Sequence, residues 1–170
     1  MKRTIKILGL VFGAALFLVI AIAAYIQTSE IPSYPIPEVD YQVKVTPESL
    51  ENGKKIVSTL CASCHRSPKI GLLTGKLMKD APEEFGTIYS QNITRDSVHG
   101  IGEWTAKELL VLLRTGIKRD GQYAPPYMAK LPLMADEDIN DVIAFLTSDD
   151  PMIAAVPEED PACEPSFLTK

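Results

Sequence analysis

The most constraining feature of the sequence is the pentapeptide Cys61-Ala62-Ser63-Cys64-His65. Two thiols three positions apart lie about one helical turn from each other, so each can form a thioether with one vinyl group of the same haem. The histidine directly after the second thiol can then bring its imidazole to the iron from the proximal side. The pattern predicts one covalent haem c, attached through Cys61 and Cys64, with His65 as an iron ligand.

Two other uses of paired cysteines fit less well. A thioredoxin-like redox pair needs a βαβ context, whereas the segments on both sides of the pentapeptide read as helices. A zinc site needs two more ligands at suitable spacing, and only His99 and Cys163 remain for that role. With three cysteines in the chain, no disulfide framework is implied.

The N-terminus carries a long apolar run behind the basic residues Lys2, Arg3 and Lys6. Residues 7–26 contain no charge, and as a helix they would be about 30 Å long, which is the thickness of a bilayer's hydrocarbon core. We therefore expect residues 1–29 to form a transmembrane anchor, with its basic end in the cytoplasm and the rest of the chain outside. That orientation places the haem motif on the periplasmic side of a bacterial inner membrane, where haem c is assembled.

Two alternatives concern this anchor. A cleavable signal peptide usually has a shorter apolar region, yet Ala21-Ile22-Ala23 could serve as a weak cleavage site. Gly9 and Gly13 have the small-xxx-small spacing that lets two membrane helices approach closely. This spacing predicts a homodimer through Gly9 and Gly13, although glycine is common in such helices.

The remaining chain divides into three parts. Residues 30–45 are rich in proline and should be extended, either as a tether that holds the domain away from the membrane or as a segment packed along it. Residues 46–150 form the predicted haem domain, and residues 151–170 form an acidic, proline-rich tail.

Helix signals dominate the predicted domain, so its fold class is all-α. Thr46-Pro47 is a helix start that leads towards the haem motif, and Thr105 with Glu108 forms a capping box for a short helix that Gly116 ends. Three acidic residues near 136–138 begin the last helix, because negative charge is favourable at a helix N-terminus.

The iron needs a sixth ligand from the side opposite His65. Met128 is the preferred candidate, because two prolines stiffen the loop before it and it lies eight residues before the final helix. Met134 reads instead as one half of a hydrophobic staple with Ile139, if Ala135 is the N-cap. The other candidates are less well placed in the sequence: Met78, His99 and Met152.

Haem propionates that are buried need hydrogen-bond donors. Trp104 is the first choice for this role. Three further residues could also donate: Arg95, Tyr123 and Tyr127.

Over residues 46–150 the sequence resembles a single-haem class I bacterial cytochrome c. Its middle section is similar to the haem domains of cytochrome subunits of membrane-bound alcohol, aldehyde and sugar-acid dehydrogenases. That likeness rests on three stretches: Tyr89-Ser90-Gln91-Asn92-Ile93-Thr94-Arg95-Asp96, Gly100-Ile101-Gly102-Glu103-Trp104-Thr105 and Asp120-Gly121.

The resemblance implies a cytochrome c fold, with three main helices around one haem and the first and last helices crossing near Gly53 and Phe145. Three departures stand out. Those subunits usually carry several haem domains, whereas this chain has one C-x-x-C-H. Ala129 stands where the family usually has proline after the methionine, and Ala135 stands where Ser or Thr usually caps the last helix.

These features predict a one-electron carrier rather than an enzyme, relaying electrons between membrane complexes. The expected partners are dehydrogenases, quinol-oxidising complexes or terminal oxidases. A net charge of −5 argues against nucleic acid as a partner. Two alternatives stay open: a haem subunit within a larger oxidoreductase complex, and a haem-based peroxidase or sensor with a labile sixth ligand.

Overall fold

The computed structural model describes residues 2–159 and 161–167. Residues 160 and 168–170 of the predicted tail, and Met1 of the predicted anchor, lie outside the described residues. The helices, in chain order, are α1 (Lys2–Thr28), α2 (Pro47–Ile56), the π-helical turn η1 (Val57–Cys61), α3 (Ala62–His65), the 3-10 turn η2 (Glu83–Phe85), α4 (Ala106–Thr115), α5 (Asp136–Leu146) and the 3-10 turn η3 (Pro151–Ile153).

The centre of the domain is the crossing of α2 and α5, which make more contacts with each other than any other pair of elements. The crossing is close because Gly53 has no side chain. A Cβ atom there would lie 2.0 Å from the carbonyl oxygen of Asp141 and 2.8 Å from the Cβ of Phe145. The predicted crossing near Gly53 and Phe145 is therefore confirmed.

The helix ends follow the predicted signals. Thr46 caps α2, with Ser49 as its reciprocal partner, and Thr105 caps α4 through the expected capping box with Glu108. Gly116 ends α4 in a left-handed conformation, with a φ of 80°. Ala135 is the N-cap residue of α5 and provides no side-chain hydrogen bond.

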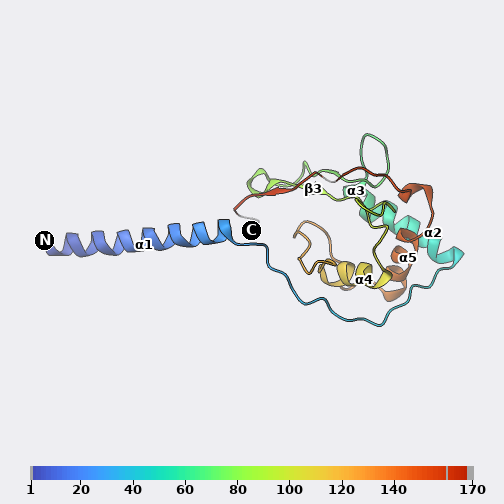
Figure 1. Cartoon of the computed structure of the whole chain (residues 1–170), viewed down its shortest axis with the longest axis horizontal. Coiled ribbons are helices and arrows are strands. Elements are labelled where there is room, and N and C mark those ends of the chain that lie inside the picture. The colour runs from blue at the N-terminus through green and yellow to red at the C-terminus, as the bar shows by residue number, and fades with distance from the viewer. Residues whose placement is uncertain (1, 160, 168–170) are drawn as a thin grey trace.

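Short strand pairs add to a mainly helical architecture. In antiparallel pairs, β1 (Lys76–Leu77) meets β3 (Tyr89–Ser90) and β2 (Gly86–Thr87) meets β4 (Glu164–Pro165). The second pair brings the C-terminal tail back onto the domain (Figure 1). Cys163 lies beside it, where its thiol sulfur is 3.3 Å from the Tyr89 backbone nitrogen.

The proline-rich segment 30–45, here called the strap, also lies along the domain. Ser33 forms an antiparallel bridge with Gln122, and at the other end the Asn140 side chain contacts both backbone polar groups of Lys44. Figure 1 shows the strap passing below the domain from the end of α1 towards α2. Of the two sequence-based interpretations, the structure favours the packed segment.

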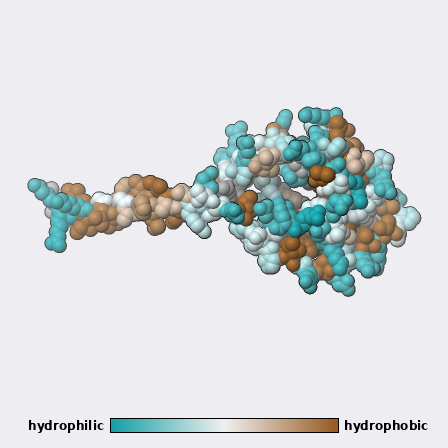
Figure 2. Space-filling model, in the orientation of Figure 1, coloured by the Kyte–Doolittle hydropathy of each residue, from teal (hydrophilic) through white to brown (hydrophobic). Residues whose placement is uncertain are grey.

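Helix α1 projects away from the domain (Figure 1) and carries a band of apolar residues along its length (Figure 2). It is long and apolar enough to cross a membrane, and signal sequences share both properties. A Cβ atom added at Gly9 or Gly13 would meet no other atom within 4 Å, so both positions face open space. The homodimer through these glycines stays a prediction.

The α2–α5 crossing should not tolerate a larger residue at Gly53. Gly53→Ala places a methyl group against backbone atoms, so we expect a loss of about 1–3 kcal/mol in the free energy of unfolding. Chemical denaturation of the haem-loaded protein measures this loss. Gly9→Ala, in open space on α1, is the matched control and should leave the domain's unfolding midpoint unchanged; an equal midpoint for both variants would contradict the packing argument.

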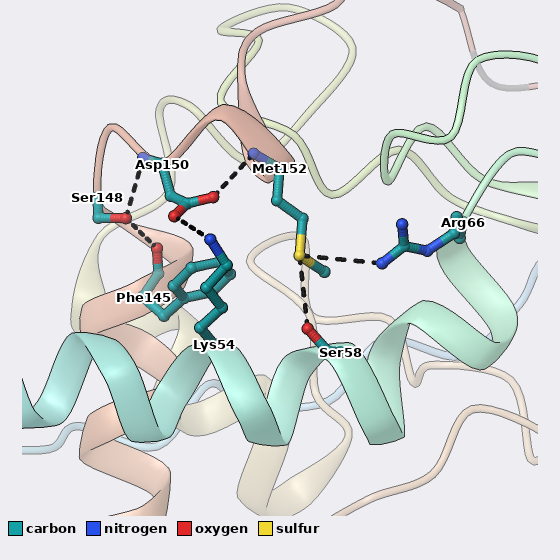
Figure 3. Close-up of polar contacts among 7 residues, drawn as sticks. All are labelled: Lys54, Ser58, Arg66, Phe145, Ser148, Asp150 and Met152. Atoms are coloured by element: carbon teal, nitrogen blue, oxygen red, sulfur yellow. Dashed lines mark hydrogen bonds and ion pairs between the residues drawn. The ribbon is translucent and has the colours of Figure 1, made fainter.

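A second contact ties the segment after α5 to α2 outside the core (Figure 3). The Asp150 carboxylate lies 2.8 Å from Lys54 Nζ and accepts a hydrogen bond from the Met152 backbone N–H. Burial raises the pKa of Asp150, but the hydrogen bonds from Lys54 and Met152 outweigh it, and the pKa ends below its ordinary value of 3.8.

Because that pKa is lowered in the folded state, the stabilisation is present above pH 3.8 and is lost as the pH falls through the folded-state value. We expect Asp150→Asn to lower stability at pH 7 by less than about 1 kcal/mol, since surface ion pairs contribute little. Thermal unfolding at a series of pH values should show the two proteins converging below pH 3.8. A constant difference down to the most acidic pH would rule out titration of Asp150 as the cause.

Candidate functional site

The haem motif sits directly after a widened turn of helix. Residues 57–61 form η1, in which the Ala62 N–H donates to the Val57 carbonyl five residues earlier. One extra residue in a turn rotates everything beyond it by about 100° relative to a continuous α-helix. The side chains of the motif therefore point in a different direction from the one they would take if α2 continued as a regular α-helix.

His65 is held by its backbone surroundings as a neutral imidazole. Its Nδ1 lies 2.7 Å from the carbonyl oxygen of Gln91. A carbonyl only accepts, so Nδ1 carries the proton and Nε2 keeps the lone pair that a metal needs. Burial lowers the pKa of His65, the hydrogen bond to Gln91 acts in the opposite direction, and the Lys76 ammonium lowers it further.

Within the described part of the chain, the two cysteines of the motif form no disulfide. Burial, with a smaller contribution from the neighbouring Cys64, raises the pKa of Cys61 to about 11. An environment that disfavours a thiolate suits an uncharged sulfur. This position therefore matches the thioether expected in a covalent haem attachment.

The carbonyl groups at the end of α3 are satisfied by the segment that follows. Gly75 N–H donates to the His65 carbonyl, Ser90 Oγ to that of Cys64, and Lys76 Nζ to that of Ser63, each at 2.7 Å. A helix end left without such partners would be unstable. These contacts fix the height and tilt of the short helix that carries His65.

Beside this segment, Thr74 has a buried hydroxyl. Within the part of the chain that the structure describes, Thr74 Oγ1 has no hydrogen-bond partner. A buried hydroxyl without a partner is unfavourable. An acceptor on a bound group, such as a haem carboxylate, is one way to satisfy it.

Met128 lies in the loop between α4 and the last helix. We call residues 116–130 the methionine loop. The loop folds back on itself, because Ala124 N–H donates to Gly116 at 2.6 Å and Met128 N–H donates to Pro125 at 3.0 Å. Lys130 closes it, with Nζ 2.9 Å from the Ala124 carbonyl and 2.5 Å from the Pro125 carbonyl.

The methionine loop and the haem motif lie on different sides of the domain. In Figure 1, α3 and β3 lie above the middle of the domain, and α4 with the methionine loop lies below it. Figure 2, in the same orientation, shows this face hollowed between them. A flat group placed there would lie between the two segments that carry His65 and Met128.

Two of the other methionines, Met134 and Met152, make side-chain contacts of their own. Met152 packs outside this region: its sulfur lies 3.6 Å from Ser58 Oγ and 4.0 Å from Arg66 Nη2 (Figure 3). Met134 packs against the core cluster that contains Ile139, as the predicted staple requires. Met78 contributes a backbone hydrogen bond to the Ile88 carbonyl.

His99 lies in a turn, where its backbone N–H donates to the Asp96 carboxylate at 2.7 Å. That environment matches the interpretation of His99 as a turn residue. The assignment of Met128 as the sixth ligand stays a prediction.

Trp104 is partly buried against the core, with the Arg119 guanidinium 5.7 Å from its ring centroid. Arg119 also lies 3.5 Å from Glu108, in the first turn of α4. Trp104 is thus a packing residue at the start of α4, and its predicted role toward a propionate is untested. Arg95, another candidate donor, has its backbone N–H bonded to the Ile153 carbonyl, and its predicted role toward a propionate is likewise untested.

Tyr123 and Tyr127 both belong to the methionine loop. The ring centroid of Tyr123 lies 4.6 Å from the Lys130 ammonium. Burial raises the pKa of Tyr127, and Cys163 in the tail raises it further.

Sequence reasoning missed several of these contributors. Gln91 acts through its backbone carbonyl, which no side-chain pattern reports. Lys130 is a basic residue close to a proline-rich stretch, and that was the only feature of the sequence that pointed to it. No feature of the sequence pointed to Thr74. Together with His65, Cys61 and Met128, these groups fit a covalently held haem.

Comparison with known protein families identifies the domain. Residues 50–149 match the family model described as cytochrome c. A cytochrome c domain implies covalently bound haem c, which agrees with the spacing of Cys61 and Cys64 in one helical segment.

Curated relatives fall in the same family. The chain is 38% identical over 87 residues, half of its length, to the cytochrome c subunit of alcohol dehydrogenase (quinone) from Gluconobacter oxydans, and covers 18% of that protein. It is 38% identical over 93 residues, 52% of its length, to the fructose dehydrogenase cytochrome subunit of Gluconobacter japonicus, again covering 18%. It is 30% identical over 169 residues, 94% of its length, to a diheme cytochrome c-type protein of Cereibacter sphaeroides, covering 52%.

The chain thus spans under a fifth of the two dehydrogenase subunits and about half of the diheme protein. These relatives differ in overall length. The family match over residues 50–149, which contain both the C-x-x-C-H motif and Met128, shows that this chain belongs to the cytochrome c family.

Proposed function

We propose that this protein is a one-electron carrier with a single covalent haem c, relaying electrons from a dehydrogenase into the respiratory chain at the outer face of a bacterial inner membrane. The observation that carries the proposal is the combination of the cytochrome c match with relatives named as cytochrome subunits of alcohol and fructose dehydrogenases. Electron transfer, rather than catalysis on a substrate, is what such subunits have in common.

The protein's own groups suit this role. When bound, haem iron supplies a one-electron couple between its ferric and ferrous states. His65 offers Nε2, because its Nδ1 proton is held by the Gln91 carbonyl. Met128 offers a soft thioether sulfur, which favours the ferrous state and raises the reduction potential relative to a second histidine.

If both His65 and Met128 held the iron, a substrate would find no open position on it. This argues against the peroxidase or sensor alternative.

The proposed location at the outer face of the membrane rests on the basic residues at the start of α1 and on the length of that helix. The single-haem state rests on the one C-x-x-C-H motif in the sequence.

A second candidate is a haem subunit held permanently within a larger oxidoreductase. It is favoured by the names of the relatives, several of which are subunits of dehydrogenases. The two candidates share the same chemistry and differ in whether the protein dissociates from its electron donor.

Met128→Ala tests the iron site. Without the sulfur, we expect the methionine–Fe(III) charge-transfer band to disappear and the reduced protein to bind carbon monoxide readily. The reduction potential should fall by about 0.1 V or more, since axial ligands set haem potentials over a range of about 0.8 V. Absorption spectroscopy and a redox titration measure these changes.

Two other methionines provide matched controls. Met134→Leu and Met152→Leu alter thioethers that pack on the core or contact Ser58, so both should keep the band and the potential. An intact band in Met128→Ala, or its loss in one of the controls, would show that the sixth ligand is assigned wrongly.

Experiments on native membranes test whether the protein takes electrons from a dehydrogenase. Gentle solubilisation should co-purify the protein with a dehydrogenase, and a dehydrogenase substrate should reduce its haem in membrane vesicles. Ethanol and fructose are the first donors to try, given the named relatives. Co-purification that survives high salt favours the permanent subunit, since screening weakens electrostatic encounters, and dissociation in salt favours the carrier. A haem that dehydrogenase substrates never reduce would refute both.

A further inference from the structure

The strap crosses the loop that carries the predicted sixth ligand. Tyr34 N–H donates to the Gly121 carbonyl at 2.7 Å, and the neighbouring Ser33 pairs with Gln122 in an antiparallel bridge. The segment that follows α1 is therefore joined by backbone hydrogen bonds to the turn of the methionine loop.

The crossing leaves no room for a side chain. Gly121 has a φ of 79°, and a Cβ atom there would lie 2.9 Å from the Tyr34 carbonyl oxygen and 3.5 Å from Ser33 Cβ. The turn and the strap are thus packed backbone against backbone. A displacement of the strap would move the turn with it.

From this crossing, side chains continue towards Met128. The rings of Tyr34 and Tyr123 meet edge to face, with centroids 6.5 Å apart and planes at 71°. The Tyr123 ring also contacts the Lys130 ammonium, which lies 4.6 Å from its centroid. Lys130 then donates to the carbonyls of Ala124 and Pro125, which precede Met128.

Gly116 completes the packing of this chain of contacts. A Cβ atom there would lie 2.8 Å from both Lys130 Cε and Tyr123 Cε2. The lysine stem and the tyrosine ring are therefore seated against the backbone at the end of α4. We call Tyr34, Tyr123 and Lys130 the clamp.

We propose that the clamp positions Met128, so that the strap leading from the membrane helix sets how firmly the sixth ligand is held. Tyr34 is in this sense a positioning residue of the iron site, although it is 94 residues from Met128 in the sequence. The proposal rests on the assignment of Met128 as a ligand under the proposed function.

The physical basis is preorganisation. A loop that is free to move must lose conformational entropy each time its methionine binds iron, and this weakens the bond. A loop already folded by the clamp loses less. Removing a clamp contact should therefore increase the fraction of molecules whose sixth iron position is open.

The clamp also limits where the domain can sit. Tyr34 is six residues beyond Thr28, the last residue of α1. Six residues span at most about 20 Å, so the methionine loop stays within that reach of the helix end. The face that carries Met128 is thereby kept near the anchor.

The test compares full-length, haem-loaded variants in lipid nanodiscs. Tyr34→Ala removes the edge-to-face contact and Lys130→Met removes the donor to the two carbonyls, whereas Tyr34→Phe and Lys130→Arg keep a ring or a charge. For Tyr34→Ala we expect a weaker charge-transfer band and about a 2- to 10-fold larger fraction of reduced protein that binds carbon monoxide rapidly. Lys130→Met should change both readouts in the same direction, and the two conservative variants should stay close to the unmodified protein.

Two further variants separate positioning from general stability. Gly53→Ala weakens the α2–α5 crossing without touching the clamp, and Tyr41→Phe removes the hydrogen bond to Asn140 at the far end of the strap. Both should retain the band at temperatures where the protein is folded.

The outcomes are distinct. An unchanged band and unchanged carbon monoxide binding in both Tyr34→Ala and Lys130→Met, alongside loss of the band in Met128→Ala, would overturn the clamp and leave the ligand assignment standing. An unchanged band in Met128→Ala would overturn the ligand assignment itself. Equal weakening in Gly53→Ala would show that global stability, rather than the clamp, holds the methionine.

Discussion

The close crossing of α2 and α5 is the contact on which the rest of the domain depends. Gly53 lets the two backbones meet at the Asp141 carbonyl, and side chains at the edge of the crossing reinforce it, since Asn52 Nδ2 lies 2.8 Å from Asp141 Oδ2. Helix α2 is continuous with the haem motif through η1. The crossing therefore fixes the direction from which His65 approaches the centre of the domain.

Around this fixed element, the groups that adjust the site come from distant segments and act largely through the backbone. The Gln91 carbonyl sets the tautomer of His65, and the Ser90 hydroxyl holds the carbonyl of Cys64. On the opposite side, the strap and Lys130 hold the methionine loop. The motif supplies the ligand, and segments far from it in the sequence hold it in position.

This division explains what could be predicted from the sequence. Caps depend on residues three or four positions apart, so Thr46, Thr105 and Gly116 were correctly predicted as helix boundaries. The crossing at Gly53 followed from resemblance to a known family. The π-helical turn at 57–61 was not predicted, because it depends on packing after the helix has formed rather than on residue type.

Pairing between distant segments escaped prediction for a related reason. The β2–β4 pair and the Ser33–Gln122 bridge join segments far apart in the chain, and neither has a side-chain signature. Prolines and charge in residues 30–45 and in the tail indicate extended backbone and leave its location open.

The strap returns to the methionine loop, and this has a consequence for electron transfer. Transfer is fastest when the iron site changes little between its two oxidation states, so a carrier benefits from a methionine whose position is set by the protein rather than by the iron. The strap contacts the methionine loop at Gly121 and Gln122. The methionine loop is thus held from outside by the chain that leads into the domain. Under the proposed assignment of Met128, the sixth ligand is positioned in part by the segment that joins the domain to helix α1.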